Sequence, residues 1–276
     1  MKQTNDLSVD IEETKQTLVD FIRSKVSRAG YSRAVVGLSG GVDSSLSGYL
    51  AAAALGPENV MAIRMPYKTS SAESLDHAQL VIDNLGVNSL TIPITDMVTP
   101  LFERFPAANQ IRRGNAMARA RMIVLYDQSH AFEGLVVGTG NKTEFLLGYT
   151  TLYGDAACAF NPLGDLYKTR VRQLARAMGV PDVIITKPPS ADLWLDQTDE
   201  GELGFTYEEV DQLLFLLVDK RYPPDECIKA GYDEHFVKAV INLIRKNSFK
   251  RVMPPIAKLS DQEISEQYLS FGDWGR

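Results

Sequence analysis

The stretch Ala34-Val35-Val36-Gly37-Leu38-Ser39-Gly40-Gly41-Val42-Asp43-Ser44-Ser45 decides the fold, because an apolar run ends there in a loop of glycines and serines. A helix of small residues is predicted directly after it, from Leu46 to Leu55. Backbone N–H groups of such a loop can close on phosphate oxygens, and the N-terminus of the helix adds partial positive charge. The order of strand, loop and helix therefore predicts an anion-binding site in an α/β protein.

Short apolar runs alternate with helical patterns along the first two-thirds of the chain, which is typical of βαβ units. We expect a doubly wound, mainly parallel five-stranded sheet with helices on both faces, followed by C-terminal helices. The predicted strands are Ala34–Leu38, Val60–Met65, Ser89–Ile94, Leu135–Thr139 and, from a weaker pattern, Val183–Ile185. The predicted helices are Ala72–Leu85, Asn109–Ala131, Leu166–Met178, Thr206–Lys220 and Asp233–Lys246, with a long acidic loop over Ser190–Phe205.

Length and composition describe a globular protein. The 276 residues are 45% hydrophobic, and we expect one domain over 1–276, with an N-terminal helical segment at 1–30 and a polar tail at 260–276. The net charge of -6 argues against nucleic acid as a partner. No apolar run approaches the length of a membrane span, and only two cysteines occur, without zinc-ligand spacing. We therefore expect no membrane and a cytoplasmic location.

Asp43 is unexpected in a phosphate-binding loop, because its carboxylate repels phosphate unless a divalent cation lies between them. This implies Mg²⁺. The plainer alternative is a helix N-cap beside a tight turn. Two common nucleotide motifs are absent: the chain has no G-x-x-x-x-G-K-[ST], and Arg64 stands where a dinucleotide-binding fold would place an acidic residue.

The loop resembles the SGGxDS pyrophosphate loop of the ATP pyrophosphatases. Four further segments resemble the ammonia-dependent NAD⁺ synthetases, and the likeness runs from about Gly37 to Ala257. These segments are Gly138–Glu144 (GTGNKTE), Tyr153–Asp155 (YGD), Asn161–Lys168 (NPLGDLYK) and Lys187–Leu193 (KPPSADL). The resemblance implies an adenine nucleotide alpha hydrolase-like fold. It also implies amidation of deamido-NAD⁺ by ammonia, with ATP giving AMP and pyrophosphate through an adenylate intermediate.

The resemblance also assigns residues. ATP would be bound by Gly37, Leu38, Ser39, Gly40, Gly41, Val42, Asp43, Ser44, Arg64, Thr139, Lys168 and Ser190. Mg²⁺ would be held by Asp43 and Glu144, and the dinucleotide would contact Arg119, Lys250 and the position of Phe249. Asp43, Lys168 and Asp155 would be catalytic, with Asp155 holding and deprotonating ammonium.

From the residues alone, several of these roles have alternatives. Glu144 fits a surface glutamate that begins a helix, and Arg119 lies on an arginine-rich helix whose face suits solvent. Lys168 begins a helix, where a cation is unfavourable unless an anion compensates it, so a phosphate partner is favoured over a solvated lysine.

The chain departs from the family pattern at three substrate positions. Leu152 and Ala159 replace a lysine and an aspartate of the pattern T-K-Y-G-D-G-G-x-D, and Phe249 replaces a histidine. We expect the ATP chemistry to be retained and the acceptor to be held by other contacts. A changed acceptor is the alternative.

The resemblance further implies a homodimer. The length leaves no room for an amidase domain, so ammonia is expected from outside the chain, either free or delivered by a separate glutaminase. Two other functions compete: a different ATP pyrophosphatase, such as a tRNA-modifying ligase, and a nucleotide sensor without turnover.

Overall fold

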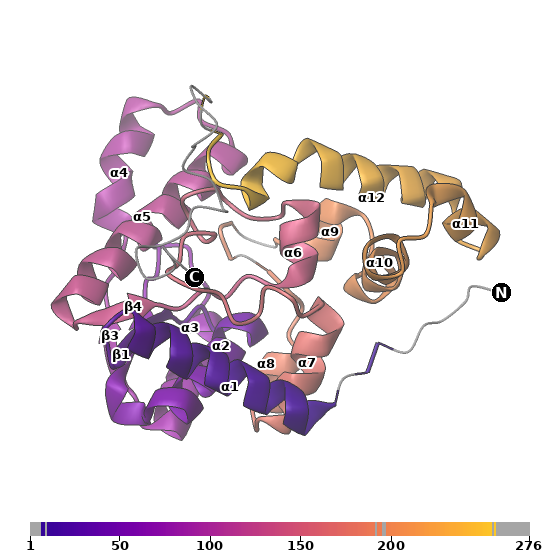
Figure 1. Cartoon of the computed structure of the whole chain (residues 1–276). Coiled ribbons are helices and arrows are strands. Elements are labelled where there is room, and N and C mark those ends of the chain that lie inside the picture. The colour runs from indigo at the N-terminus through magenta and orange to yellow at the C-terminus, as the bar shows by residue number, and fades with distance from the viewer. Residues whose placement is uncertain (1–6, 9, 191, 195–196, 256, 258–276) are drawn as a thin grey trace.

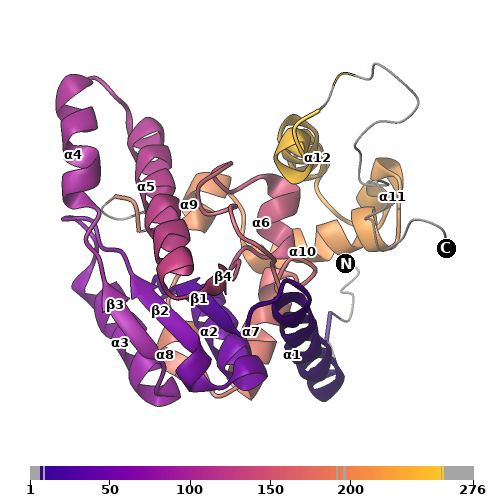
Figure 2. The ribbon, with the colours of Figure 1, turned by 60° about the vertical axis from the view of Figure 1, so that its left-hand side comes forward.

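The computed structural model describes residues 7–8, 10–190, 192–194, 197–255 and 257. Figure 1 shows the chain, which contains a four-stranded parallel sheet of order β3-β2-β1-β4; all four strands are labelled in Figure 2. The strands are β1 Arg33–Gly37, β2 Val60–Arg64, β3 Asn88–Thr91 and β4 Gly134–Val136. Ala34 is aligned with Val60 on one side and with Leu135 on the other, so β1 lies inside the sheet. The predicted parallel α/β fold is confirmed.

The fifth strand, predicted at Val183–Ile185, is wrong. These residues belong to the short helix α8, Asp182–Ile185, which follows Pro181. Ile184 and Ile185 are buried in the main core, and periodicity alone does not distinguish such a short apolar run in a strand from one in a helical turn. The other four strands end earlier than predicted, β1 and β2 by one residue each, β3 at Thr91 and β4 at Val136.

Both faces of the sheet are covered by helices. Val36 of β1 packs into the core on one face and its neighbour Val35 into the core on the other, as alternation along a buried strand requires. Figure 2 shows α2 and α3 on one side of the strands and α4 and α5 on the other. The first face is covered by α1 Ile11–Arg28, α2 Val42–Leu55, α3 Ala72–Leu85, α7 Lys168–Ala177 and α8, and the second by α4 Thr95–Arg104 and α5 Gln110–Ala131.

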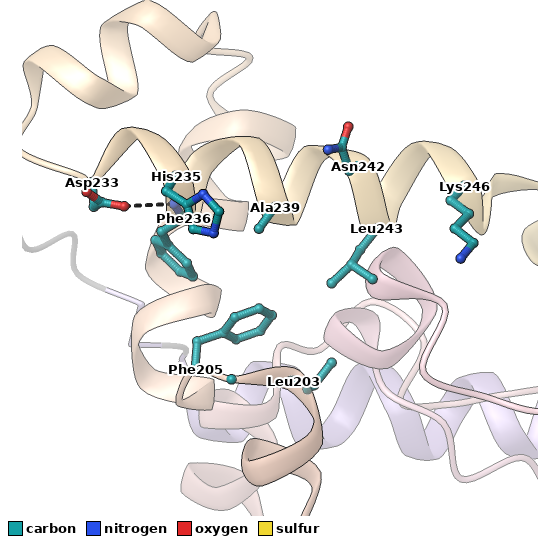
Figure 3. A pocket seen from close by; sticks show the side chains of 10 residues that line it. Leu203, Phe205, Asp233, His235, Phe236, Ala239, Asn242, Leu243 and Lys246 are labelled. Carbon is teal, nitrogen blue, oxygen red and sulfur yellow. Dashed lines mark hydrogen bonds between the residues drawn. The ribbon is translucent and has the colours of Figure 1, made fainter. Parts of the chain in front are cut away.

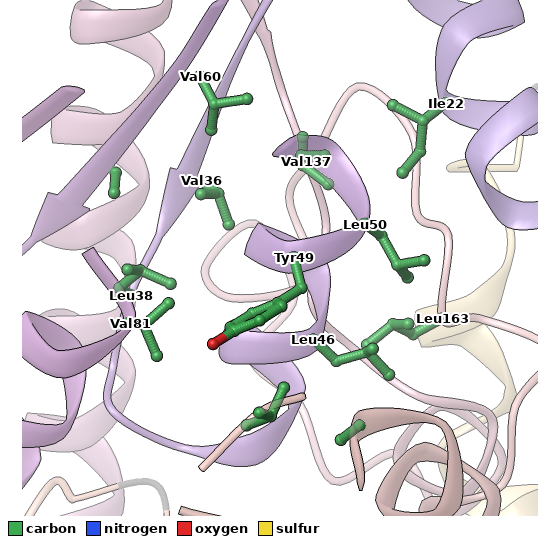
Figure 4. Packing of buried hydrophobic residues seen from close by; sticks show 14 of the residues in the cluster. Ile22, Val36, Leu38, Leu46, Tyr49, Leu50, Val60, Val81, Val137 and Leu163 are labelled. Carbon is green, nitrogen blue, oxygen red and sulfur yellow. The ribbon is translucent and has the colours of Figure 1, made fainter. Parts of the chain in front are cut away.

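Helix α2 is the central element of the larger core. Its small and apolar residues are buried along most of its length, and Leu46 and Leu50 are fully enclosed. Figure 4 shows these two side chains among residues from α1, the sheet and the later loops. Burial of α2 on several sides fixes its N-terminus, and with it the glycine loop, relative to the sheet.

The C-terminal helices form a second core, which also includes residues of α6, Lys142–Leu147, and Tyr167. Part of the predicted acidic loop at Ser190–Phe205 is in fact helix α9, Asp199–Leu203, with Thr198 as its N-cap. The predicted helix Thr206–Lys220 is divided into α10, Tyr207–Leu214, and a π-helix, Phe215–Asp219. Helices α11, Pro224–Lys229, and α12, Glu234–Lys246, complete this part.

The predicted N-terminal helical segment corresponds to α1, whereas the predicted tail at 260–276 lies outside the described residues. Within the described part of the chain, no helix has both the length and the apolar character needed to cross a membrane.

Candidate functional site

The candidate site lies where the order of strand addition reverses, between the parallel strands β1 and β4. Strands β2 and β3 are added beside one edge of β1, and β4 is added beside its other edge. Ligands of open parallel sheets bind at such a point, beyond the carboxyl ends of the strands. The two loops that leave β1 and β4 meet there: Asn141 Nδ2 donates to Asp43 Oδ1 at 2.9 Å, and Ser47 Oγ donates to the Gly138 carbonyl at 3.1 Å.

The loop after β1 is held in shape by its own serines. Ser39 N donates to Ser44 Oγ at 3.2 Å, and Gly41 N donates to Ser39 Oγ at 3.3 Å. Gly40 has φ +80°, and a Cβ built there would lie 2.1 Å from the Ser74 carbonyl oxygen. Only glycine fits this position. The N-cap of α2 is Gly41, which makes no side-chain cap, so the first amides of the helix are not capped by their own residue.

Lys168 connects the β1 and β4 loops through charge. It is the first residue of α7, and its Nζ makes a short hydrogen bond to Asp43 Oδ2 and lies 3.6 Å from Glu144 Oε1. The side chain is only 3% exposed. Burial lowers the pKa of Lys168, but the negative charges of Asp43, Glu144 and Asp199 outweigh burial and raise it. The lysine is therefore cationic, and these carboxylates compensate its charge in the structure. The predicted phosphate partner stays a prediction.

Glu144 is oriented by the N-terminus of α6. Its Oε2 accepts from Asn141 N at 3.0 Å while Asn141 Oδ1 accepts from Glu144 N at 3.0 Å, which is a complete capping box. Burial raises the pKa of Glu144, and the charge of Asp43 raises it further. Two carboxylates that repel each other in a buried place attract a cation. Among the described residues, however, no group of three or more metal-ligating side chains converges.

Three other residues predicted to bind ATP lie on neighbouring segments. Arg64 ends β2, and its buried Nε has no hydrogen-bond partner among the described residues. Thr139 lies on the loop after β4. Ser190 lies on the segment that follows α8. Lys187 in this segment contacts the start of α3, because its Nζ donates to Ser74 Oγ at 2.9 Å. Because Ser74 also faces Gly40, this segment adjoins the glycine loop.

The residues predicted to bind the dinucleotide hold the segment 148–155. Lys250 Nζ donates to the carbonyls of Gly148, at 2.7 Å, and Thr150, at 2.8 Å. Arg119, on α5, donates through Nη2 to the Leu152 carbonyl at 3.1 Å. Burial lowers the pKa of Lys250, although the nearby charge of Asp155 opposes this. Lys250 and Arg119, both predicted to bind the dinucleotide, therefore donate hydrogen bonds to the same loop.

Asp155 has both oxygens engaged in the same loop: Oδ1 accepts from Thr151 N at 2.8 Å and Oδ2 from Thr150 Oγ1 at 2.5 Å. A cleft of about 540 Å³ adjoins the loop and is lined by Leu152, Cys158 and Lys250, with Tyr126 and Val252. Phe249 is 57% exposed and is absent from this lining.

A second groove, of about 510 Å³, lies between α12 and the turn after α9 (Figure 3). Phe205, Phe236 and Leu243 give it an apolar wall, and none of the residues predicted for the site lines it.

Sequence reasoning missed three side chains near Lys168. The Lys168 ammonium lies 5.2 Å from the centre of the Tyr207 ring, and the Tyr207 hydroxyl donates to Asp199 Oδ2 at 3.1 Å. Asp211, one turn further along α10, bonds to residues beside Lys168 and Glu144. Asp199 belonged to the predicted acidic loop, and the other two fell in an ordinary helical pattern, so only the fold reveals their position.

The parallel sheet with helices on both faces makes this an α/β protein, and a glycine loop at the switch point of such a sheet is typical of those that bind nucleotides. Comparison with known proteins is more specific. The family model described as NAD synthase matches residues 14–254. The chain belongs to the NAD synthase family.

Individual relatives agree with this membership. An NH(3)-dependent NAD(+) synthetase of Trichlorobacter lovleyi is 52% identical over 270 residues, which cover 98% of this chain and 99% of that protein. The corresponding protein of Chlorobaculum tepidum is 49% identical over 274 residues, 99% of each chain.

Two solved structures are similar in fold. The NH3-dependent NAD synthetase of Campylobacter jejuni, in complex with the nitrate ion, has a TM-score of 0.77 and 34% identity, covering 91% of this chain and 100% of that one. The NMN synthetase of Francisella tularensis has a TM-score of 0.81 and 29% identity, covering 91% of this chain and 99% of that one.

Proposed function

We propose that the ion cluster around Lys168 activates a carboxylic acid with ATP, and that the cleft beside Lys250 holds the acid. The family and its curated relatives indicate ATP-dependent amidation of deamido-NAD⁺ by ammonia to give NAD⁺, and we propose AMP and pyrophosphate as the other products. The observation that carries the site assignment is the convergence of the loops after β1 and β4 on a buried lysine that opens a helix. We propose that one domain, 1–276, performs the reaction in the cytoplasm.

In the first step, the nicotinate carboxylate attacks the α-phosphorus of ATP and pyrophosphate leaves. The carboxylate is already ionised at neutral pH, so this step needs alignment and charge neutralisation rather than a general base. The amides of the glycine loop and the Lys168 ammonium supply positive charge to the leaving pyrophosphate. Arg64, whose buried Nε is unpartnered among the described residues, is proposed to bind the nucleotide together with Thr139 and Ser190.

Mg²⁺ is proposed at Asp43 and Glu144. These carboxylates fit a hard cation, because they are oxygen ligands and both lie against the Lys168 ammonium. Burial raises the pKa of Glu144, and the charge of Asp43 raises it further, so a second cation there would be stabilised. When bound, Mg²⁺ would neutralise phosphate charge.

In the second step, ammonia attacks the carbonyl of the adenylate, and AMP leaves. Ammonium must first lose its proton, and Asp155 is proposed to hold and deprotonate it. Its hydrogen bonds to Thr150 and Thr151 fix the carboxylate in the loop that lines the cleft. The ammonia is proposed to be free or delivered by a separate glutaminase.

We propose a homodimer as well. Several large apolar side chains remain exposed on the faces around α5 and the cleft, and a second copy would cover them. They include Ile111, Ile123, Tyr126, Tyr153, Val252 and Met253.

A substrate comparison tests the proposal. When deamido-NAD⁺ is added with ammonium, ATP should be cleaved to AMP and pyrophosphate in equal amounts. Lys168→Met should reduce turnover by about 100-fold or more. A mononucleotide acid is the second candidate acceptor, favoured by the likeness to the NMN synthetase and by Leu152, Ala159 and Phe249. Turnover of the mononucleotide alone would identify that acceptor, and ATP that binds without cleavage would refute both reactions.

A further inference from the structure

Asp211 is a buried carboxylate that bonds to two separate segments of the site. It lies on α10 and has no exposed surface. Its Oδ1 accepts from Thr143 Oγ1 at 2.5 Å, while its Oδ2 accepts from Thr169 N and from Thr169 Oγ1, both at 2.8 Å. Thr143 is the second residue of α6 and Thr169 the second residue of α7. One side chain therefore joins the N-termini of two helices.

These bonds reach the backbone of Lys168. Thr143 Oγ1, which donates to Asp211, also accepts from Lys168 N at 3.1 Å. The N-cap residue of α7, Tyr167, makes no side-chain cap of its own. The first two amides of α7 are therefore satisfied by a hydroxyl from α6 and a carboxylate from α10, in place of a local cap. The negative charge of Asp211 near the N-terminus of α7 also interacts favourably with the helix dipole, whereas the positive charge of Lys168 interacts unfavourably with it.

The same helix contacts the Lys168 side chain. Tyr207 precedes Asp211 by four residues, so both lie on one face of α10, and the Tyr207 ring lies beneath the ammonium. At the end of the following π-helix, Asp219 accepts from the Tyr167 hydroxyl and, at 2.9 Å, from Lys142 Nζ. Asp219 therefore holds Tyr167 and Lys142, the residues that directly precede Lys168 and Thr143.

We propose that Asp211 is a positioning residue for adenylation: through Thr143 and Thr169, it sets the place of the Lys168 ammonium relative to the Glu144 carboxylate. The inference rests on the proposed role of Lys168. Lys168 and Thr169 are adjacent at the start of α7, and Thr143 and Glu144 are adjacent at the start of α6. Loss of the shared carboxylate would let the two helix ends move apart, and a displacement of about 1 Å at a reacting group can reduce the rate roughly 100-fold.

The experiment compares matched variants of the full chain. Thr143→Val removes the hydroxyl but keeps the shape, whereas Thr143→Ser keeps the hydroxyl. Asp211→Asn removes the charge. Leu213→Ala, also on α10 and fully buried, destabilises the same helix without removing a polar contact. AMP formation is measured per folded protein, at a temperature where circular dichroism shows each variant folded, with KM for deamido-NAD⁺ determined alongside.

We expect kcat to fall about tenfold or more for Asp211→Asn and Thr143→Val, with KM for deamido-NAD⁺ within about twofold of the parent. Thr143→Ser should restore kcat to within about threefold, and Leu213→Ala should lower stability while leaving kcat unchanged. Unchanged kcat in Asp211→Asn, equal losses in both Thr143 variants, or an equal loss in Leu213→Ala would each overturn the inference.

Lys168→Met separates this inference from the proposed function. If Lys168→Met is inactive while Asp211→Asn is fully active, the positioning role alone is refuted. If Lys168→Met retains the parent kcat, the proposed function of Lys168 is itself wrong, whatever the Asp211 variants do.

Discussion

Replacing Gly40 with alanine perturbs the glycine loop at its tightest point. The added methyl has two consequences, one for the backbone and one for packing. At φ +80° an L-residue is strained, which costs about 1–2 kcal/mol. The new Cβ would also lie 2.1 Å from the Ser74 carbonyl oxygen, where ordinary contact begins at 3.4 Å. The loop and the start of α3 must therefore separate by roughly 1 Å, since overpacking is relieved only by movement of the backbone.

The expected loss is the sum of the two effects. Overpacking costs about 1–3 kcal/mol, so Gly40→Ala should lower the free energy of unfolding by about 2–5 kcal/mol in total. Gly30→Ala is the control, because Gly30 has the same φ of +80° and nothing within 4 Å of its added Cβ. Gly30→Ala should lower the free energy of unfolding through backbone strain alone, by about 1–2 kcal/mol.

Urea unfolding measures both losses, and steady-state assays measure turnover. Gly40→Ala should also reduce kcat/KM for ATP by about 100-fold, because the phosphate-binding amides are displaced by roughly 1 Å, whereas Gly30→Ala should keep it. Equal destabilisation of the two variants, or normal ATP kinetics in Gly40→Ala, would refute the close approach of Gly40 to Ser74.

Three further predictions concern other parts of the chain. Burial would raise the pKa of Asp219, but hydrogen bonds from Tyr167 and Lys142 outweigh it and lower the pKa below 3.8, so this carboxylate stabilises the fold above that pH and loses the effect on acidification. The stability difference between the parent and Asp219→Asn should therefore shrink from pH 5 to pH 3 in urea titrations, and a constant difference would contradict it. Lys250→Met should raise KM for deamido-NAD⁺ about tenfold and leave KM for ATP unchanged; a change in KM for ATP alone would place Lys250 elsewhere. Burial raises the pKa of the Cys158 thiol, so iodoacetamide should label it more slowly at pH 8 than a free thiol, and still more slowly with bound dinucleotide; labelling that ignores the dinucleotide would separate the thiol from the substrate.

The sequence was informative wherever the deciding interactions are local. The glycine loop could be predicted because φ > 0, small side chains and a following helix are properties of adjacent residues. The run at Val183–Ile185 misled because a few apolar residues suit a strand or a helical turn equally, and here they form the short helix α8 after Pro181.

The charge network could be predicted only in part. The position of Lys168 at the start of a helix indicated that an anion would compensate it. Asp43 does so from 125 residues away in the chain, and Asp211 contacts Thr143 across 68 residues. No sequence pattern records such pairings. Asp211 looks like any polar residue of an amphipathic helix until the fold places it between the ends of α6 and α7.

The most direct test of the central claim, acid activation through an adenylate, follows the oxygen atoms of the substrate. Deamido-NAD⁺ carrying oxygen-18 in its nicotinate carboxylate is incubated with ATP, ammonium and the protein, and the products are analysed by mass spectrometry. One labelled oxygen should appear in AMP and the other should remain in the amide of NAD⁺, because the carboxylate oxygen that attacks phosphorus leaves with AMP. Label found in pyrophosphate, or AMP formed without label, would contradict the account.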